Sequence, residues 1–239
     1  MADNYRYLNE MRMDEIEEMV DPIFMLPLGI SEGHGEHLPI GTDTFQAVYV
    51  SEKVAEELDH DVVIAPVLNY GHCRATKNLP GTISISFDTL RDIVNDILES
   101  AIEQGFHKFV LISGHAGRTH MTALRLACEN ILSDYEVDIL LLTDYDFAYE
   151  LKGKEVPDTD GHGGEIETSR ILHIRPDLVG ENRPVSEVRY PRFKVIKDYS
   201  IYLVKGMRGD SSKATRDEGE KIDEYVIDGI IEHIERELL

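Results

Sequence analysis

Residues 23–58 read IFMLPLGISEGHGEHLPIGTDTFQAVYVSEKVAEEL, and they join two apolar patterns through a loop rich in glycine, histidine and acidic residues. The apolar run Ile23–Leu28 has the length of a buried strand and stops at Gly29. From Thr44 to Leu58 the apolar residues recur at the spacing of a helix. The stretch therefore predicts a strand, a polar loop and a helix in succession.

The same unit recurs along the chain. Further apolar runs predict strands at Asp61–Val67, Phe109–Ser113 and Val137–Thr143, and helical spacing recurs at Leu90–Ile102 and Met121–Leu132. Strands that alternate with helices are typical of a parallel sheet with helices on both faces. The pattern predicts an α/β fold, a three-layer sandwich with a mostly parallel central sheet, formed as a single domain over residues 1–239.

The remaining segments are less regular. Gly153–Gly164 reads as a loop rich in glycine and aspartate, Arg189–Val204 as an extended segment, and Glu218–Leu239 as an acidic amphipathic helix. No internal repeat is evident.

The net charge and the cysteine content exclude several classes of partner and of metal site. The chain of 239 residues carries a formal net charge of −22, so it gains nothing from counterion release, and nucleic acids and anionic membranes are excluded as partners. Its two cysteines form no CxxC pair, which argues against a disulfide framework and a thiolate zinc site. With no signal-peptide pattern and no apolar run long enough to span a bilayer, we expect a cytoplasmic protein.

The loop of residues 29–43 is the first group of residues suited to chemistry. Its glycines let the backbone bring Glu32, His34, His37 and Asp43 into one neighbourhood. Imidazole and carboxylate together suit zinc, manganese or ferrous iron. The alternative is a set of solvated loop residues with Asp43 as a helix cap, and for His37 the two interpretations are balanced.

Two further histidines follow the same logic. His115 lies in a glycine-flanked turn directly after a predicted strand, and His162 precedes Glu165 and Glu167 at a predicted helix start. Ligands of parallel sheets bind at the carboxyl ends of the strands. One of the two glutamates can equally serve only the helix dipole. No nucleophile elbow, phosphate-binding loop or HExxH motif competes, so the convergence predicts metal-assisted hydrolysis or isomerisation.

The motifs together resemble the creatininase (creatinine amidohydrolase) family. The most specific is LPLGISEGHGEHLPIGTDT at residues 26–44. It is followed in order by NYGH (69–72), PGTIS (80–84), GHAG (114–117), HGGEIETS (162–169) and RPDLV (175–179).

The resemblance implies a creatininase-like fold with two divalent metal ions per chain, zinc, manganese or iron. Glu32, Asp43 and His115 would bind one ion, and His34 with the bridging Asp43 would bind the other. Creatininase has a further glutamate ligand where this chain has Gly117. Glu167, or as the weaker alternative Glu165, is expected to replace it and to take part in catalysis. The family also implies a homo-oligomer, a hexamer.

The implied reaction is hydrolysis of a carbon–nitrogen amide bond, other than a peptide bond, by a hydroxide that bridges the metals. His162 would protonate the leaving nitrogen, and His72 and Thr82 would shape the pocket. Creatinine itself is not expected, because the chain has no tryptophan and carries Asp158 where the family's main substrate-facing tryptophan would be. A cyclic amide or a formamide of a small molecule is the predicted substrate.

Two other functions use the same residues. A metal-dependent phosphoesterase would exploit the same hydroxide, and a non-catalytic metal-binding subunit would keep the ligands but need no acid such as His162. Arg118, beside the His115 turn, is a basic residue in a very acidic chain. It either contacts a carboxylate or phosphate of the substrate or forms a surface ion pair.

Overall fold

A parallel sheet of five strands forms the centre of the computed structural model, which describes residues 5–154, 159–186, 188–189, 191, 193–199 and 201–239. The strand order is β1-β3-β2-β4-β5, and all four neighbouring pairs are parallel. Their bounds are β1 (Tyr5–Tyr7), β3 (Val62–Ile64), β2 (Ile23–Leu28), β4 (Lys108–Ser113) and β5 (Asp138–Thr143). In the central register, Ile23 lies opposite Lys108 and Leu28 opposite Ser113.

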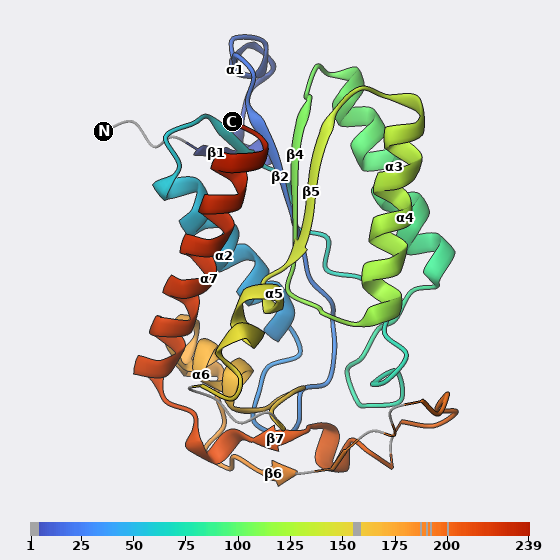
Figure 1. The fold of residues 1–239 in the computed structure, drawn as a ribbon, viewed down its shortest axis with the longest axis vertical. Coiled ribbons are helices and arrows are strands. Elements are labelled where there is room, and N and C mark those ends of the chain that lie inside the picture. The colour runs from blue at the N-terminus through green and yellow to red at the C-terminus, as the bar shows by residue number, and fades with distance from the viewer. Residues whose placement is uncertain (1–4, 155–158, 187, 190, 192, 200) are drawn as a thin grey trace.

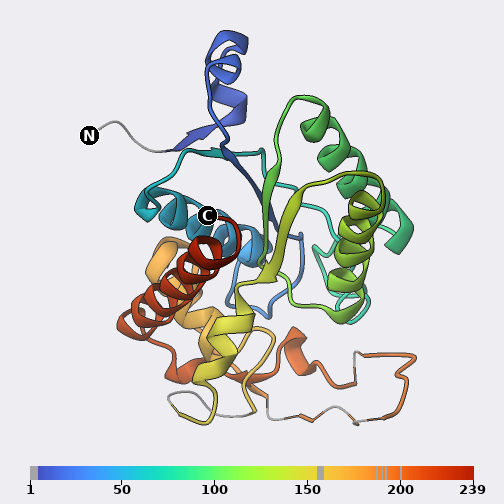
Figure 2. The same cartoon turned by 45° about the horizontal axis from the view of Figure 1, so that its top comes forward.

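Helices cover both faces of this sheet (Figures 1 and 2). One face carries α2 (Thr42–Glu57) and α7 (Arg216–Glu237), with the shorter α5 (Tyr145–Ala148) and α6 (Glu165–Ile174) at their lower ends in Figure 1. The other face carries α3 (Phe87–Glu103) and α4 (Arg118–Asp134). The predicted three-layer α/β sandwich is therefore confirmed.

The central strand β2 explains why both layers are needed. Ile23 and Met25 pack in the core shared with α2 and α7, while Phe24 and Leu26 pack in the core shared with α3 and α4. All six residues of β2 are buried. A strand covered on both faces needs an apolar side chain at nearly every position, as its sequence has.

The expected elements differ from the observed ones mainly at the edges. The edge strand β1 was not predicted, because three alternating residues are too short a pattern to detect. Strand β3 is shorter than the predicted Asp61–Val67. The segment Arg189–Val204 was predicted to be extended, but its described residues form no β-strand and pair with no other strand. Phe193 and Val195 of this segment are largely exposed. The described part of Gly153–Gly164 is a loop, as predicted.

Smaller elements complete the chain. A two-stranded antiparallel sheet pairs β6 (Val185–Ser186) with β7 (Gly209–Asp210). The remaining short helices are η1 (Leu8–Glu10), α1 (Met13–Glu17), η2 (Tyr149–Leu151), η3 (Pro176–Leu178), η4 (Val204–Gly206) and η5 (Ser211–Lys213). None of the described helices combines the length and the apolar composition that a membrane span requires.

Candidate metal centre

The start of α2 lies against the ends of two strands, and glycines make this approach possible. A Cβ atom on Gly114, after β4, would stand 2.0 Å from the backbone oxygen of Asp43. One on Gly29, after β2, would stand 2.2 Å from Oγ1 of Thr44. Because neither glycine has a side chain, the first turn of α2 brings Asp43 to the carboxyl edge of the sheet.

Asp43 stands between two histidines at this edge. Its Oδ1 lies 2.9 Å from Nε2 of His34, and its Oδ2 lies 3.2 Å from Nδ1 of His115. Oε2 of Glu32 is 2.8 Å from the same nitrogen of His115, and Oε2 of Glu167 is 3.6 Å from that of His34. The two oxygens of Asp43 therefore face two different sets of possible metal ligands: Oδ1 faces His34 and Glu167, and Oδ2 faces His115 and Glu32.

Several of these donor atoms are buried without a hydrogen bond. Oε2 of Glu32, Nε2 of His34 and Oδ2 of Asp43 are close to other polar atoms, yet none makes a hydrogen bond of acceptable geometry. Buried polar atoms in folded proteins are nearly always satisfied, so each exception requires an explanation. Atoms that converge on a common point without bonding to one another are what a cation site requires. Imidazole and carboxylate donors fit zinc, manganese or iron.

The charges of the cluster are strongly coupled. Burial alone would lower the pKa of His34, but the carboxylates of Asp43 and Glu167 outweigh it and raise the pKa to about 10. Burial would likewise raise the pKa of Glu32, but His115 and the other nearby histidines bring it well below its usual range. The close approach of imidazole and carboxylate therefore shifts both pKa values toward the charged forms. Metal ligands must be deprotonated, so an ion would replace the histidine protons.

Of the two glutamates of α6, only Glu167 faces this cluster. Its carboxylate forms a group with His34 and Asp43 whose ligand atoms all lie within 4.8 Å of one another. Its Oε2 also accepts a 2.5 Å hydrogen bond from the backbone nitrogen of Gly163. Glu165 instead interacts electrostatically with Lys213, Asp210 and Glu218. The geometry therefore favours Glu167, and not Glu165, as the metal ligand that replaces the glutamate missing at position 117.

His162 lies at the border of the cluster. Its Nε2 is 2.8 Å from the backbone oxygen of Gly33, and since a carbonyl only accepts, this nitrogen carries the hydrogen. Its ring centroid is 4.2 Å from that of His34, and one ring nitrogen lies within 4.8 Å of donors on Glu32 and His34. The side chain is half-buried, and together with Glu32 and His34 it forms a further group of closely spaced ligand atoms.

The other predicted substrate-binding residues have different surroundings. Oγ1 of Thr82 accepts a 2.9 Å hydrogen bond from the nitrogen of Gly33, so it fixes the loop that carries Glu32 and His34. Nδ1 of His72 is 3.0 Å from the backbone oxygen of Ile85. Asp158 lies outside the described residues.

Arg118 is the first residue of α4 and is exposed. It lines a cavity of about 490 Å³ that also includes Ala116, Arg125 and Tyr149. None of the ion pairs among the described residues involves Arg118, so the surface ion pair considered above is not observed. Ala116 is the residue after His115, but none of the candidate metal ligands lines this cavity.

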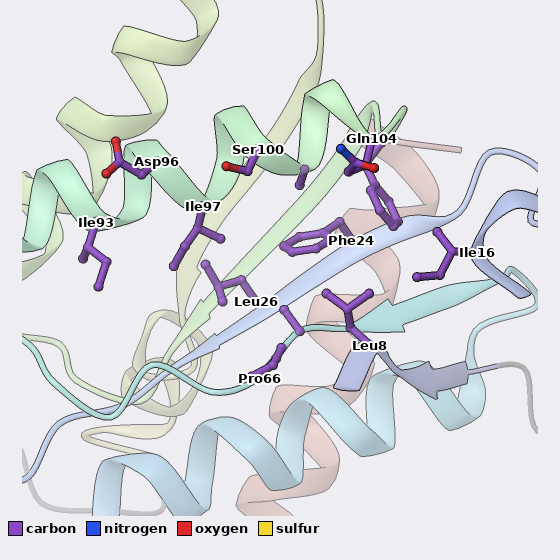
Figure 3. A pocket seen from close by; sticks show the side chains of 13 residues that line it. Leu8, Ile16, Phe24, Leu26, Pro66, Ile93, Asp96, Ile97, Ser100 and Gln104 are labelled. Carbon is purple, nitrogen blue, oxygen red and sulfur yellow. The ribbon is translucent and has the colours of Figure 1, made fainter. Parts of the chain in front are cut away.

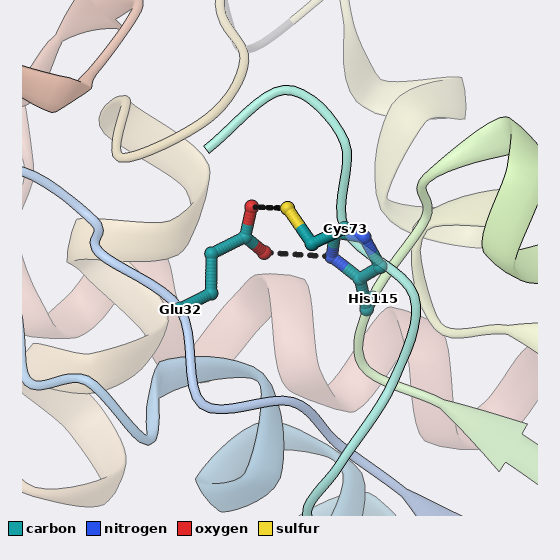
Figure 4. A group of neighbouring side chains, drawn as sticks. All are labelled: Glu32, Cys73 and His115. Carbon is teal, nitrogen blue, oxygen red and sulfur yellow. Dashed lines mark hydrogen bonds and ion pairs between the residues drawn. The ribbon is translucent and has the colours of Figure 1, made fainter. Parts of the chain in front are cut away.

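Three residues near the centre were missed in the sequence. Cys73 and Thr76 are buried and contact Oε1 of Glu32. Figure 4 shows the contact of Cys73. Burial and the charge of Glu32 raise the pKa of the Cys73 thiol. His120 is buried with its ring 5.0 Å from that of His115, and burial lowers its pKa well below the usual range. The spacing of Cys73 and Thr76 from the other motifs gave no signal, because a separate loop brings them in.

A buried arginine lies behind the centre. Arg170 of α6 is fully buried and contacts Asp223 of α7, Asp144 after β5 and Gln46 of α2, at 2.6, 2.8 and 3.0 Å respectively. Burial raises the pKa of Asp144 to about 6, against the opposing effect of Arg170. Arg170 and Glu167 are three residues apart on α6, and Gln46 and Asp43 are three residues apart on α2. The cluster thus joins the two helices that present ligand candidates.

A separate cavity on the other side of the sheet lacks a cluster of metal-binding side chains. It is a cavity of about 530 Å³ between α1, α3 and the sheet, and Leu8, Ile16, Phe24, Leu26 and Ile97 point into it (Figure 3). Its apolar lining offers no set of donors for a metal. The reaction centre is therefore sought at the carboxyl edge of the sheet.

His37 is placed outside the donor groups. Its Nε2 is 2.9 Å from Oγ1 of Thr168 on α6, and Gly180 donates a 2.8 Å hydrogen bond to its backbone oxygen. Of the two interpretations of His37, the geometry favours a structural residue that ties the loop after β2 to α6.

His37 is expected to make the metal-free protein sensitive to acid. Burial lowers its pKa from the ordinary 6.5 to about 4. Between these values the unfolded chain binds a proton that the folded chain does not, so stability falls as the pH falls through this interval. Urea unfolding of wild type and His37→Gln across the interval should give a shallower pH dependence for the variant. Parallel pH profiles would contradict a neutral buried His37.

Comparison with known proteins identifies the family of this chain. The family model described as creatinine amidohydrolase matches residues 9–234. The chain belongs to the creatininase family. A mycofactocin precursor peptide peptidase of Mycolicibacterium smegmatis is 31% identical over 93% of this chain and 87% of that protein. The creatinine amidohydrolase of Pseudomonas putida is 28% identical over 97% and 96%.

Solved structures of creatininase have the same fold. A creatininase described as the Mn form superposes with a TM-score of 0.85 at 26% identity, covering 98% of this chain and 99% of that chain. This creatininase-family chain is therefore a hydrolase that acts on carbon–nitrogen bonds, as the resemblance implied.

Proposed function

We propose that this creatininase-family protein binds two divalent metal ions between Glu32, His34, Asp43, His115 and Glu167, and hydrolyses an amide C–N bond of a small molecule. The observation that carries the proposal is that the two oxygens of Asp43 lie against two different histidines, His34 and His115, with unpartnered buried atoms on Glu32, His34 and Asp43 itself. Manganese and zinc–zinc forms of creatininase have been solved, which supports these metals as the first to test.

The ions would supply an acidified water and polarise the scissile carbonyl when bound. The chain's own residues would supply the rest. Asp43 and Glu167 would bring negative charge to the site, and Thr82 would keep the loop of Glu32 and His34 in place through its bond to Gly33. His162 would hold a proton beside the leaving nitrogen, because amide nitrogen leaves poorly unless protonated.

The substrate class is the finer part of the proposal. A formamide or cyclic amide agrees with the absence of tryptophan from the chain, which argues against creatinine itself. One solved creatininase is a complex with creatine, and another relative is a peptidase. We extend the proposal to a cytoplasmic homo-oligomer, a hexamer of single-domain chains, on the family resemblance.

The experiment is a screen of metal-loaded protein against formamides, lactams, short peptides and phosphate esters, with Asp43→Ala prepared in parallel as the background. Release of amine or ammonia by wild type alone would support the proposal. Hydrolysis of phosphate esters alone would make the protein a phosphoesterase. Full metal binding with no turnover on any class would favour a non-catalytic metal-binding subunit.

Substitution of His162 is expected to separate turnover from metal binding. Loss of one general acid typically lowers the rate by about a hundredfold. His162→Ala should therefore reduce kcat by about that factor and leave the metal content unchanged. Elemental analysis beside the rate assay checks this. Metal lost in proportion to activity would reassign His162 as a ligand, a role that its distances to Glu32 and His34 also permit.

Arg118 is proposed to bind an anionic group of the substrate in the cavity that it lines with Ala116, the residue after His115. A hydrogen bond to a charged group contributes about 1.5–3 kcal/mol, which corresponds to roughly a tenfold to hundredfold change in binding. Arg118→Met should raise KM for an anionic substrate by that amount and leave KM for its neutral analogue unchanged. Steady-state kinetics on the matched pair of substrates checks this. Equal changes for both would show that Arg118 serves only the structure.

A further inference from the structure

Cys73 is held against the candidate metal centre by the loop between β3 and α3. Its backbone nitrogen donates a 2.8 Å hydrogen bond to Oγ of Ser84, and the nitrogen of Ile85 donates a 2.9 Å bond to the oxygen of Gly71. The side chain of Cys73 is 3% exposed. These two hydrogen bonds join the two arms of the loop and hold the backbone of Cys73 in place.

The two oxygens of Glu32 have different surroundings (Figure 4). Oε1 accepts hydrogen bonds from Sγ of Cys73, at 2.9 Å, and from Oγ1 of Thr76. Oε2 is buried and has no hydrogen bond, and it lies 2.8 Å from Nδ1 of His115. Oε1 thus accepts hydrogen bonds from two neutral side chains, while Oε2 remains available to a cation.

We propose that Cys73 and Thr76 are positioning residues that hold Oε1 of Glu32 and so present Oε2 alone to the metal ion shared with His115. The proposal rests on the two-metal centre proposed above. The terminal torsion of a glutamate is broad, so a free carboxylate would rotate and exchange its two oxygens. Two donors on one oxygen remove that freedom.

The effect on metal binding should be confined to one ion. Loss of a group that orients a metal ligand typically costs about tenfold to a hundredfold in metal affinity. Glu32 belongs to one candidate group with Cys73 and His115 and to another with His34 and His162, whereas the group of His34, Asp43 and Glu167 does not contain it. Weaker binding of one ion, with the other unchanged, is the signature of this role.

The test is zinc affinity, measured by competition with a chromophoric chelator in the absence of substrate. Cys73→Ala and Thr76→Val should each weaken one of two binding steps by about ten- to a hundredfold. Cys73→Ser and Thr76→Ser keep a hydroxyl donor and should restore most of the affinity. Cys128→Ala is the matched control, because Cys128 is also buried but packs in the core with α3 and α4. It should bind both ions as wild type does.

Three results would overturn the proposal. Cys73→Ala and Thr76→Val could bind both ions as tightly as wild type, or Cys73→Ser could be as weak as Cys73→Ala. A sulfur-to-cobalt charge-transfer band in the cobalt-substituted wild type, lost in Cys73→Ser, would make the thiol a direct ligand instead. If Cys73→Ala failed to fold, judged by thermal melting of the metal-free protein, the Thr76→Val and Thr76→Ser pair would decide.

This test is independent of the reaction. Wild type that binds two ions but hydrolyses no C–N bond would contradict the proposed function and leave the role of Cys73 and Thr76 intact. A wild type that hydrolyses a C–N bond, with unchanged metal affinity in the variants, would support the proposed function and contradict the role of Cys73 and Thr76.

Discussion

Replacing Asp43 with alanine is expected to remove both metal ions and to abolish turnover. Its two oxygens face different histidines, at 2.9 Å from His34 and 3.2 Å from His115, so both donor groups lose a ligand at once. A metal ion contributes several kcal/mol of charge stabilisation to such a reaction. At about 1.4 kcal/mol for each factor of ten, the rate should fall by at least about a thousandfold. Elemental analysis and the rate assay together measure this.

Glu165→Ala is the matched control for Asp43→Ala. It also removes one carboxylate near the start of a helix at the same end of the molecule, but Glu165 belongs to none of the donor groups of the described residues. It should keep two ions per chain. Asp43→Ala with the metal content of wild type would refute the bridging position, and loss of a single ion would assign Asp43 to one group only.

The layers of the fold could be predicted because the central strands carry their own pattern. Ile23–Leu28 was predicted with its observed bounds, and Phe109–Ser113 missed only Lys108 at the start of β4. Strands buried on both faces are uniformly apolar, so neither depends on its neighbours to be recognised. The short edge strand β1 has no such pattern, and pairing with β3 is what makes it a strand.

The site could be predicted as a set of motifs but not as a geometry. Glu32, His34, Asp43 and His115 each follow a central strand or begin the next helix, and the carboxyl edge of the sheet brings them together. Glu165 and Glu167 could not be separated in sequence. Residues two apart on a helix point in different directions, and only the packing of α6 determines which of them faces His34.

The residues behind the centre gave no usable signal. Asp223 lies in a strongly acidic helix, where a solvated carboxylate is the ordinary interpretation, and it is buried only because Arg170 reaches it from α6. Cys73 lies on the loop between β3 and α3, and only the folded structure brings its thiol to Glu32, 41 residues earlier in the chain. Contacts between elements that are distant in sequence decide these cases, and a single sequence does not contain them.

Replacing Arg170 with methionine is expected to destabilise the fold by about 3–5 kcal/mol, because breaking a buried ion pair leaves its partners uncompensated. Asp144 and Asp223 are both almost fully buried, and Arg170 donates to each of them, at 2.8 and 2.6 Å. Methionine fills much of the volume but supplies neither charge nor donor. Urea unfolding of the metal-free protein would measure the loss as a lower free energy of unfolding.

Arg175→Met provides the comparison for this cost, since Arg175 lies at the end of the same helix and pairs with Asp177 on the surface, where the two side chains are 40% and 61% exposed. An exposed ion pair is screened by solvent and contributes little to stability, so this variant should unfold nearly as wild type does. Adding Asp144→Asn and Asp223→Asn to Arg170→Met should recover part of the stability, because the uncompensated charges are then removed. If Arg170→Met cost no more than Arg175→Met, or if the two asparagines recovered nothing, the buried charges would not be what joins α2, α6 and α7 behind the metal centre.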